Sequence, residues 1–314
     1  MNSNPSFLGL VQGSGDNRSM FLQLFSQEII AAAQSVLQFK DKTLWKTLSG
    51  GKSYQFPFLG GATVAYHVPG TEITGTLIDK KSVTVDPDDA LIASVFLDRL
   101  DEALSHYDGR SQHAKDLGYA IAELVDRNIV RTIIQAARSG AVIPGAAGGT
   151  VKTSANAGVN GSTLFATLLD AQVSLKTNKT LRAGDEHYGA LAPVQYSLLT
   201  RAPEMANTQY RPNADSENMA VTRINNMTVV ESTNTPFGET YVANSTIVKP
   251  AYNGNFSTTV GAVWTKYASC SVEVEDLNTD IIDQPHKRGT LILAQQTVGS
   301  RALNPACAVE IKTA

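Results

Sequence analysis

Residues 48–53, Leu-Ser-Gly-Gly-Lys-Ser, are the part of this sequence that comes nearest to a nucleotide-binding motif. A phosphate-binding loop needs another glycine five residues before its Gly-Lys pair, where the backbone turns around the phosphate, and a helix directly after it. Lys46 occupies that position here, and the segment continues into alternating aromatic residues that are typical of a strand. We therefore interpret 48–53 as a turn that precedes a strand.

The titratable residues form no catalytic or metal-binding pattern. No H-E-x-x-H or G-x-S-x-G motif occurs, and no two histidines have metal-ligand spacing. The acidic pairs Asp88-Asp89 and Glu275-Asp276 are explained by a helix start or a solvated turn. We predict a protein that is not an enzyme, with no catalytic, cofactor-binding or metal-binding residues and no cofactor.

Composition points to an ordinary globular chain. The 314 residues carry a net charge of -3, with 18% charged and 42% hydrophobic residues. A sequence-specific nucleic-acid-binding protein would normally carry a basic excess, because phosphate contacts dominate such affinity. Two cysteines are too few for a disulfide framework, and we expect buried, reduced thiols. No signal peptide and no apolar run of about 20 residues is present, so no membrane partner is expected.

The central element is a long helix predicted over residues 111–138. This stretch has no proline, and at about 1.5 Å per residue it would span on the order of 42 Å. Its apolar side changes near Asn128, which suggests contact with different parts of the protein along its length. The first apolar set comprises Ala114, Leu117, Ala120, Ile121, Leu124 and Val125, with Lys115, Asp116, Glu123 and Asp126 opposite. The second comprises Ile129, Val130, Ile133, Ile134 and Ala137.

Residues 49–86 have no helical period and read as two strands joined over a broad tip. Tyr54, Phe56 and Phe58 alternate with polar or small residues, and Val83 and Val85 do so later. An isolated two-stranded ribbon is only marginally stable in water, so its aromatic face must pack on something. The aromatic face could pack either on its own chain or on a neighbouring subunit, and the sequence leaves both alternatives open.

The remaining elements predict a mixed α+β fold. An amphipathic helix is expected from Arg18 to about Trp45 and another over 88–107, where Leu91, Val95, Leu100 and Leu104 form an apolar row. A domain boundary is expected near residue 140, where a region rich in small polar residues begins. A short helix is predicted over 163–176. Strands are predicted over 188–199, 227–231, 240–248, 258–264, 272–275, 290–298 and 306–311.

Several runs resemble a known family. Residues 49–60 (SGGKSYQFPFLG), 66–70 (YHVPG) and 106–111 (HYDGRS) are similar to major capsid proteins of short-tailed, autographivirus-type podovirus phages. Weaker matches follow in the same order at 224–231, 260–263 and 300–309.

The resemblance implies the HK97-type capsid fold. Residues 1–48 would form the N-terminal arm and helix, and 49–86 the extended loop. Residues 87–140 and 266–302 would form a peripheral domain around the spine helix 111–138. Residues 141–265 and 303–314 would form the axial domain.

The resemblance also implies a function. The chain would self-assemble as pentamers and hexamers into an icosahedral shell around double-stranded DNA, held without sequence specificity. A scaffolding protein and a portal protein would be further partners, with assembly in the bacterial cytoplasm and a final location in the virion. The expected subunit contacts in the extended loop are Tyr54, Phe56, Phe58, Val64, Tyr66 and Val68.

Two alternatives remain open at this point. One is a cell-encoded, encapsulin-like nanocompartment shell of the same fold, which would enclose protein cargo. The other is an unrecognised α+β enzyme. For the capsid hypothesis, Phe56→Asp is predicted to leave the subunit folded and to block assembly, whereas unfolding of the subunit would show that the ribbon packs on its own chain.

Overall fold

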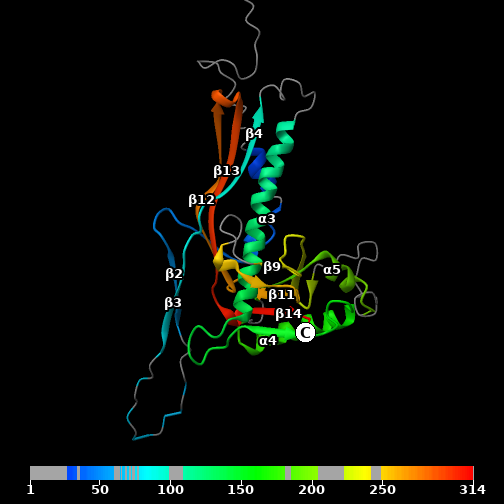
Figure 1. Cartoon of the computed structure of the whole chain (residues 1–314). Coiled ribbons are helices and arrows are strands. Elements are labelled where there is room, and N and C mark those ends of the chain that lie inside the picture. Colours follow the sequence, from blue (N-terminus) through cyan, green and yellow to red (C-terminus); the bar gives the residue numbers. More distant parts are fainter. Residues whose placement is uncertain are drawn as a thin grey trace, which may run out of the picture. The chain divides into compact units, whose positions relative to one another are not determined.

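The chain divides into two compact units. This computed structural model describes residues 27–33, 36–59, 64, 66–67, 69–70, 72, 75, 78–98, 109–180, 185–203, 223–241 and 249–313. The first unit combines Met1–Leu37, Asp88–Val125 and Val274–Val298, and the second combines Gln38–Pro87, Asp126–Glu273 and Gly299–Ala314. Several of their elements are labelled in Figure 1.

Helix α3 runs over Gly109–Arg138 and confirms the predicted spine helix. In the first unit, Ala114, Leu117, Ile121 and Val125 are buried at helical spacing, whereas Ala120 is exposed. Gly118 lies against the helical residues 27–33, since a Cβ there would stand 2.5 Å from the Ile29 carbonyl oxygen. The division between the units falls inside α3, between Val125 and Asp126 and close to the predicted change of face.

The part of α3 in the second unit is buried over most of its surface. Ile129, Val130, Ile133 and Ile134 are fully buried, and so are the polar residues Asp126, Arg131 and Thr132. The prediction that Asp126 faces solvent is therefore wrong. Polar side chains inside a protein require hydrogen-bond partners, and Thr132 Oγ1 has one in Ser269 Oγ at 2.7 Å.

Strand β4, Leu91–Asp98, replaces the helix that was predicted over 88–107. It pairs antiparallel with β13, Gly289–Ala302, from Asp98 opposite Gly289 to Leu91 opposite Gln296. The apolar residues of the sequence LIASVFLD fit both the helical and the alternating spacing, so the pattern alone does not distinguish a helix from a strand. Pairing with β13 in the first unit stabilises the strand.

The four-stranded sheet has the order β1-β12-β13-β4, and β12 and β13 run through both units. In the second unit, β1, Leu44–Thr47, pairs parallel with the start of β12, Ser269–Gln284. The N-terminal helix was predicted to continue to Trp45, which instead lies in β1. The short helix η1, Lys40–Lys42, precedes it.

The second unit contains a six-stranded sheet in the order β5-β14-β11-β6-β8-β7. Its strands are β5 (Thr150–Thr153), β14 (Ala308–Lys312), β11 (Thr259–Thr265), β6 (His187–Leu191), β8 (Met227–Glu231) and β7 (Arg223–Ile224). The predicted strand over 188–199 is right only in its first part, because Pro193 begins helix α5, Pro193–Thr200. The smaller elements are β9 (Thr240–Tyr241), η2 (Pro250–Tyr252), β10 (Gly254–Asn255), η3 (Pro285–Lys287) and η4 (Pro305–Cys307).

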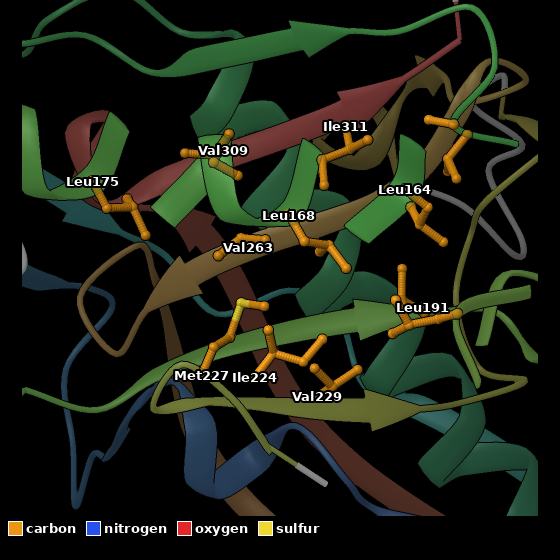
Figure 2. Close-up of a cluster of buried hydrophobic side chains, with 14 residues drawn as sticks. Leu164, Leu168, Leu175, Leu191, Ile224, Met227, Val229, Val263, Val309 and Ile311 are labelled. Atoms are coloured by element: carbon orange, nitrogen blue, oxygen red, sulfur yellow. The ribbon is translucent and has the colours of Figure 1, made fainter. Parts of the chain in front are cut away.

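Helix α4, Gly161–Thr177, covers this sheet and confirms the helix predicted over 163–176. Asn160 caps its start, with its side-chain oxygen accepting from the Ser162 N–H at 3.0 Å. Leu164, Leu168 and Leu175 share the buried face of α4. Figure 2 shows them over the apolar side chains of the sheet, and these residues form one buried cluster. The apolar members from the strands include Leu191, Met227, Val263, Val309 and Ile311.

Candidate intersubunit surface

The hairpin of β2, Tyr54–Leu59, and β3, Lys80–Val85, confirms the predicted pair of strands. They run side by side in Figure 1, paired antiparallel from Tyr54 opposite Val85 to Leu59 opposite Lys80. Gly51, in the preceding turn, has φ +110°, a conformation that favours glycine. A strand follows this turn, as predicted for residues 48–53.

One face of the hairpin packs on its own chain. Tyr54, Phe56 and Phe58 are half-buried, and together with Val83 they lie against a buried cluster. The cluster consists of Val85, Cys270, Val272 and Leu303. The Tyr54 and Phe56 rings add an aromatic contact, with centroids 4.6 Å apart. The sequence left open whether the aromatic residues pack on their own chain or on a neighbouring subunit. The structure shows that these three pack on their own chain.

The hairpin also exposes large apolar side chains beyond this core. Leu59 is 68% exposed, and Val64 and Tyr66 are 96% and 104% exposed. Exposed apolar side chains favour association, because covering them removes apolar area from water. Of the contacts predicted from sequence, Val64 and Tyr66 are thus available to a partner, whereas Val68 lies outside the described residues.

The hairpin begins at an anchored segment that sequence reasoning did not identify. Trp45 Nε1 donates to Glu273 Oε2 at 2.8 Å, and the Leu48 N–H donates to the Glu273 carbonyl oxygen at 2.8 Å. Glu273 is only 3% exposed. Its place in the predicted strand over 272–275 did not indicate this burial, and the pairing of β1 with β12 brings β1 beside it.

Asp126 of α3 fixes the chain just before η1. Its carboxylate accepts the backbone N–H groups of Gln38 at 2.9 Å and Phe39 at 3.3 Å. Burial raises the pKa of Asp126 to about 6, while these hydrogen bonds, one from Asn234 and the charge of Lys42 act in the opposite direction. The segment leading to the hairpin is therefore held by a carboxylate that titrates near neutral pH.

Replacing Asp126 with asparagine is expected to remove one component of the pH dependence of stability. The folded state retains this proton up to pH about 6, whereas the unfolded state loses it near 3.8. Stability from this group is therefore greatest at low pH and falls as the pH rises through that window. Relative to Asp126→Asn, the wild type should gain roughly 2 kcal/mol between pH about 7 and about 4. Urea unfolding at several pH values measures this, and a constant difference between the two proteins would contradict it.

Both cysteines and His187 are buried. Burial raises the pKa of the Cys270 thiol to about 12 and also raises that of Cys307, which keeps both thiols protonated. Burial lowers the pKa of His187, whose Nε2 lies 2.8 Å from Gln172 Nε2.

Within the described residues, no group of three His, Cys, Asp or Glu side chains could hold a metal ion. No helix of the described part is long and apolar enough to cross a membrane.

Comparison with known proteins identifies the family to which this chain belongs. The sequence model of the family described as "Gp10A-like: Major capsid protein" matches residues 55–312. The major capsid protein of Enterobacteria phage T3 is 25% identical over 327 residues, covering 96% of this chain and 93% of that protein. The major capsid protein of Escherichia phage T7 is 31% identical over 127 residues, which cover 39% of this chain and only 36% of the T7 protein. The solved capsid of Cyanophage P-SCSP1u has a TM-score of 0.78 and 31% identity, covering 100% of this chain and 99% of that chain.

The fold is therefore the HK97-type fold of phage capsid proteins, an α+β class that is structural and not enzymatic. The family model covers well over half of the sequence, and the cyanophage capsid covers all of it. The chain belongs to the Gp10A-like family of podovirus major capsid proteins. This confirms the resemblance inferred from residues 49–60, 66–70 and 106–111.

Proposed function

We propose that this chain forms the icosahedral shell of a phage, as pentamers and hexamers that enclose double-stranded DNA. The exposure of Val64 and Tyr66 beyond the anchored base of the β2–β3 hairpin carries this proposal. Apolar side chains that are almost fully exposed in the subunit acquire a role when a neighbouring subunit covers them. Tyr54, Phe56 and Phe58 thus orient the hairpin on its own subunit. Val64 and Tyr66 form the contact with a neighbouring subunit.

The predicted domains and partners belong to the same proposal. In the HK97-type scheme, the first unit corresponds to the peripheral domain and the six-stranded sheet of the second unit to the axial domain, with α3 as the spine helix. A scaffolding protein guides assembly in the bacterial cytoplasm, and a portal protein occupies one vertex of the virion. The net charge of -3 favours an inner wall that encloses DNA without binding a particular sequence.

Tyr66→Asp is expected to abolish shell formation and to leave the subunit folded. The side chain is fully exposed in the described structure, so the new carboxylate stays solvated in the free subunit but must be desolvated in an interface. Tyr66→Phe is the matched control, since it keeps the ring and should assemble. Electron microscopy after co-expression with the scaffolding protein shows the shells, and circular dichroism shows the fold. Normal shells from Tyr66→Asp would contradict this contact.

Phe56→Asp now has a different expected result. Phe56 packs beside the cluster of Val85 and Leu303, so a carboxylate there should destabilise the subunit itself. A Phe56→Asp subunit as stable as the wild type would show that this packing contributes little.

The contents of purified particles distinguish the phage shell from the nanocompartment alternative. The family assignment favours the phage capsid, which should contain double-stranded DNA when isolated from infected cells. Particles that hold a protein cargo and no DNA would favour the nanocompartment.

A further inference from the structure

The second unit contains a cavity of about 570 Å³ beside the base of the β2–β3 hairpin. Four separate segments line it, namely β3, the C-terminal end of α3, residues 251–254 and the C-terminal end of β13. The volume falls within the range of about 300–1,000 Å³ that is typical of ligand sites. Because the cavity opens to solvent, a ligand can enter it without unfolding of the subunit.

Two arginines line the cavity, and the chain itself holds both guanidinium groups. The Arg138 guanidinium lies 5.2 Å from the centre of the Phe256 ring, and that of Arg301 lies 5.6 Å from the centre of the Tyr252 ring. Arg301 Nη1 also donates to the Ser300 carbonyl oxygen at 2.7 Å. A guanidinium that is already oriented by stacking loses little freedom when it binds a ligand.

The charge of the lining favours an anion. Among the described residues that line the cavity, none is Asp or Glu. Arg138 is paired with the buried carboxylate of Glu310, so Arg301 is the residue that we expect to contact an anion directly. A carboxylate suits this position, because its two oxygens match the planar donors of a guanidinium.

The other lining groups distinguish a peptide from a phosphate. Gln135 Nε2 donates to the carbonyl oxygens of Ala251 and Asn253, at 2.9 and 3.0 Å, which leaves Gln135 Oε1 to accept a hydrogen bond from a ligand. A peptide supplies N–H groups for this oxygen, whereas an ionised phosphate offers only acceptors. Val83 and Ala302 add apolar surface that can contact the aliphatic part of an acidic side chain.

We propose that this cavity binds an acidic peptide segment of a partner protein, with a Glu or Asp carboxylate of the partner on Arg301. Gln135 accepts a backbone N–H of the same segment, and Val83 and Ala302 contact the stem of its acidic side chain. The site lies within one unit of a single chain, so the binding does not depend on shell formation.

Fluorescence anisotropy of the purified chain with a dye-labelled hexaglutamate peptide tests the binding. Hexaglutamate should bind and hexaglutamine should not, because only the former carries carboxylates. Arg301→Gln should weaken hexaglutamate binding at least about tenfold, the cost of one charge-assisted hydrogen bond. Arg201→Gln removes the same charge from an exposed position outside the cavity and should bind as the wild type does.

A second variant keeps the test valid if Arg301→Gln does not fold. Thr84 is exposed on β3 and lines the cavity, so Thr84→Glu places a negative charge there without disturbing the core. It should also weaken hexaglutamate binding about tenfold, whereas Thr84→Gln, of nearly the same size but uncharged, should weaken it less. Circular dichroism shows whether each variant is folded.

Three results would overturn the proposal. The first is no binding of hexaglutamate at millimolar concentration. The second is an equal loss of affinity in Arg201→Gln and Arg301→Gln, which would show attraction by the overall charge alone. The third is displacement of the peptide by inorganic phosphate or a duplex oligonucleotide at the same concentration, which would show a phosphate site. Peptide binding by chains that form no shells would support the cavity while the shell function fails.

Discussion

Replacing Arg138 with alanine should lower the free energy of unfolding by about 3 kcal/mol. Arg138 ends α3 and forms a two-pronged ion pair with Glu310, from Nε to Oε2 at 2.7 Å and from Nη2 to Oε1 at 2.6 Å. The Glu310 side chain is 0% exposed and that of Arg138 is 32% exposed. Without the arginine, the buried carboxylate retains only the Thr259 hydroxyl, at 2.6 Å, among its described side-chain partners. Urea unfolding followed by fluorescence of the buried Trp264 measures the loss.

Arg138→Lys is the matched control for this result. Lysine keeps the positive charge but presents it at one nitrogen, so it loses the paired geometry and the hydrogen bond to the Asn255 carbonyl oxygen. Arg138→Lys is expected to lower the free energy of unfolding by less than Arg138→Ala does. If alanine and lysine were equally destabilising, the charge would contribute nothing and packing on Phe256 would explain the effect.

Gly149→Ala should destabilise the second unit by about 3 kcal/mol, at the upper end of the cost of overpacking. A Cβ at this position would stand 2.3 Å from the carbonyl oxygens of Ala136 and Ala137. Both are backbone atoms of the last turn of α3, so no side-chain rotation relieves the clash. The Gly149 N–H also donates to the Ser139 carbonyl oxygen at 2.9 Å, and the alanine would disturb this bond. Thermal unfolding of the purified subunit tests the loss.

Gly140→Ala provides the comparison, because nothing lies within 4 Å of a Cβ at that position. Gly140→Ala is expected to raise the free energy of unfolding by about 0.4–1 kcal/mol, because alanine reduces the conformational freedom of the unfolded chain. Equal effects at Gly140 and Gly149 would show that backbone entropy and not close contact controls both positions.

The elements predicted best from sequence are those with strong local signals. The spine helix needed only an uninterrupted run of helix formers, and α3 extends the prediction of 111–138 by one half-turn at its start. The β2–β3 hairpin followed from the alternation of Tyr54, Phe56 and Phe58. Both patterns lie within a single segment, so no knowledge of distant residues was required.

The wrong predictions share a physical cause, which is that the partner lies far away in the sequence. Strand β4 was read as a helix because its apolar residues satisfy both periods, and pairing with β13, about two hundred residues later, decides between them. Asp126 was assigned to solvent because it is charged. Its actual environment depends on the backbone of Gln38 and Phe39, which the sequence does not place beside it.

By itself, the sequence determined the spine helix, the extended hairpin, the short helix over the six-stranded sheet and the family of capsid proteins. These depend on local periodicity and on motifs that are continuous in the chain. Only the tertiary structure decided which hairpin residues are packed on the chain's own core and which are exposed. Tyr54, Phe56 and Phe58 pack against Cys270, Val272 and Leu303, whereas Val64 and Tyr66 are exposed in the described structure. Burial is a property of the folded chain, because it depends on residues brought together from both ends of the sequence.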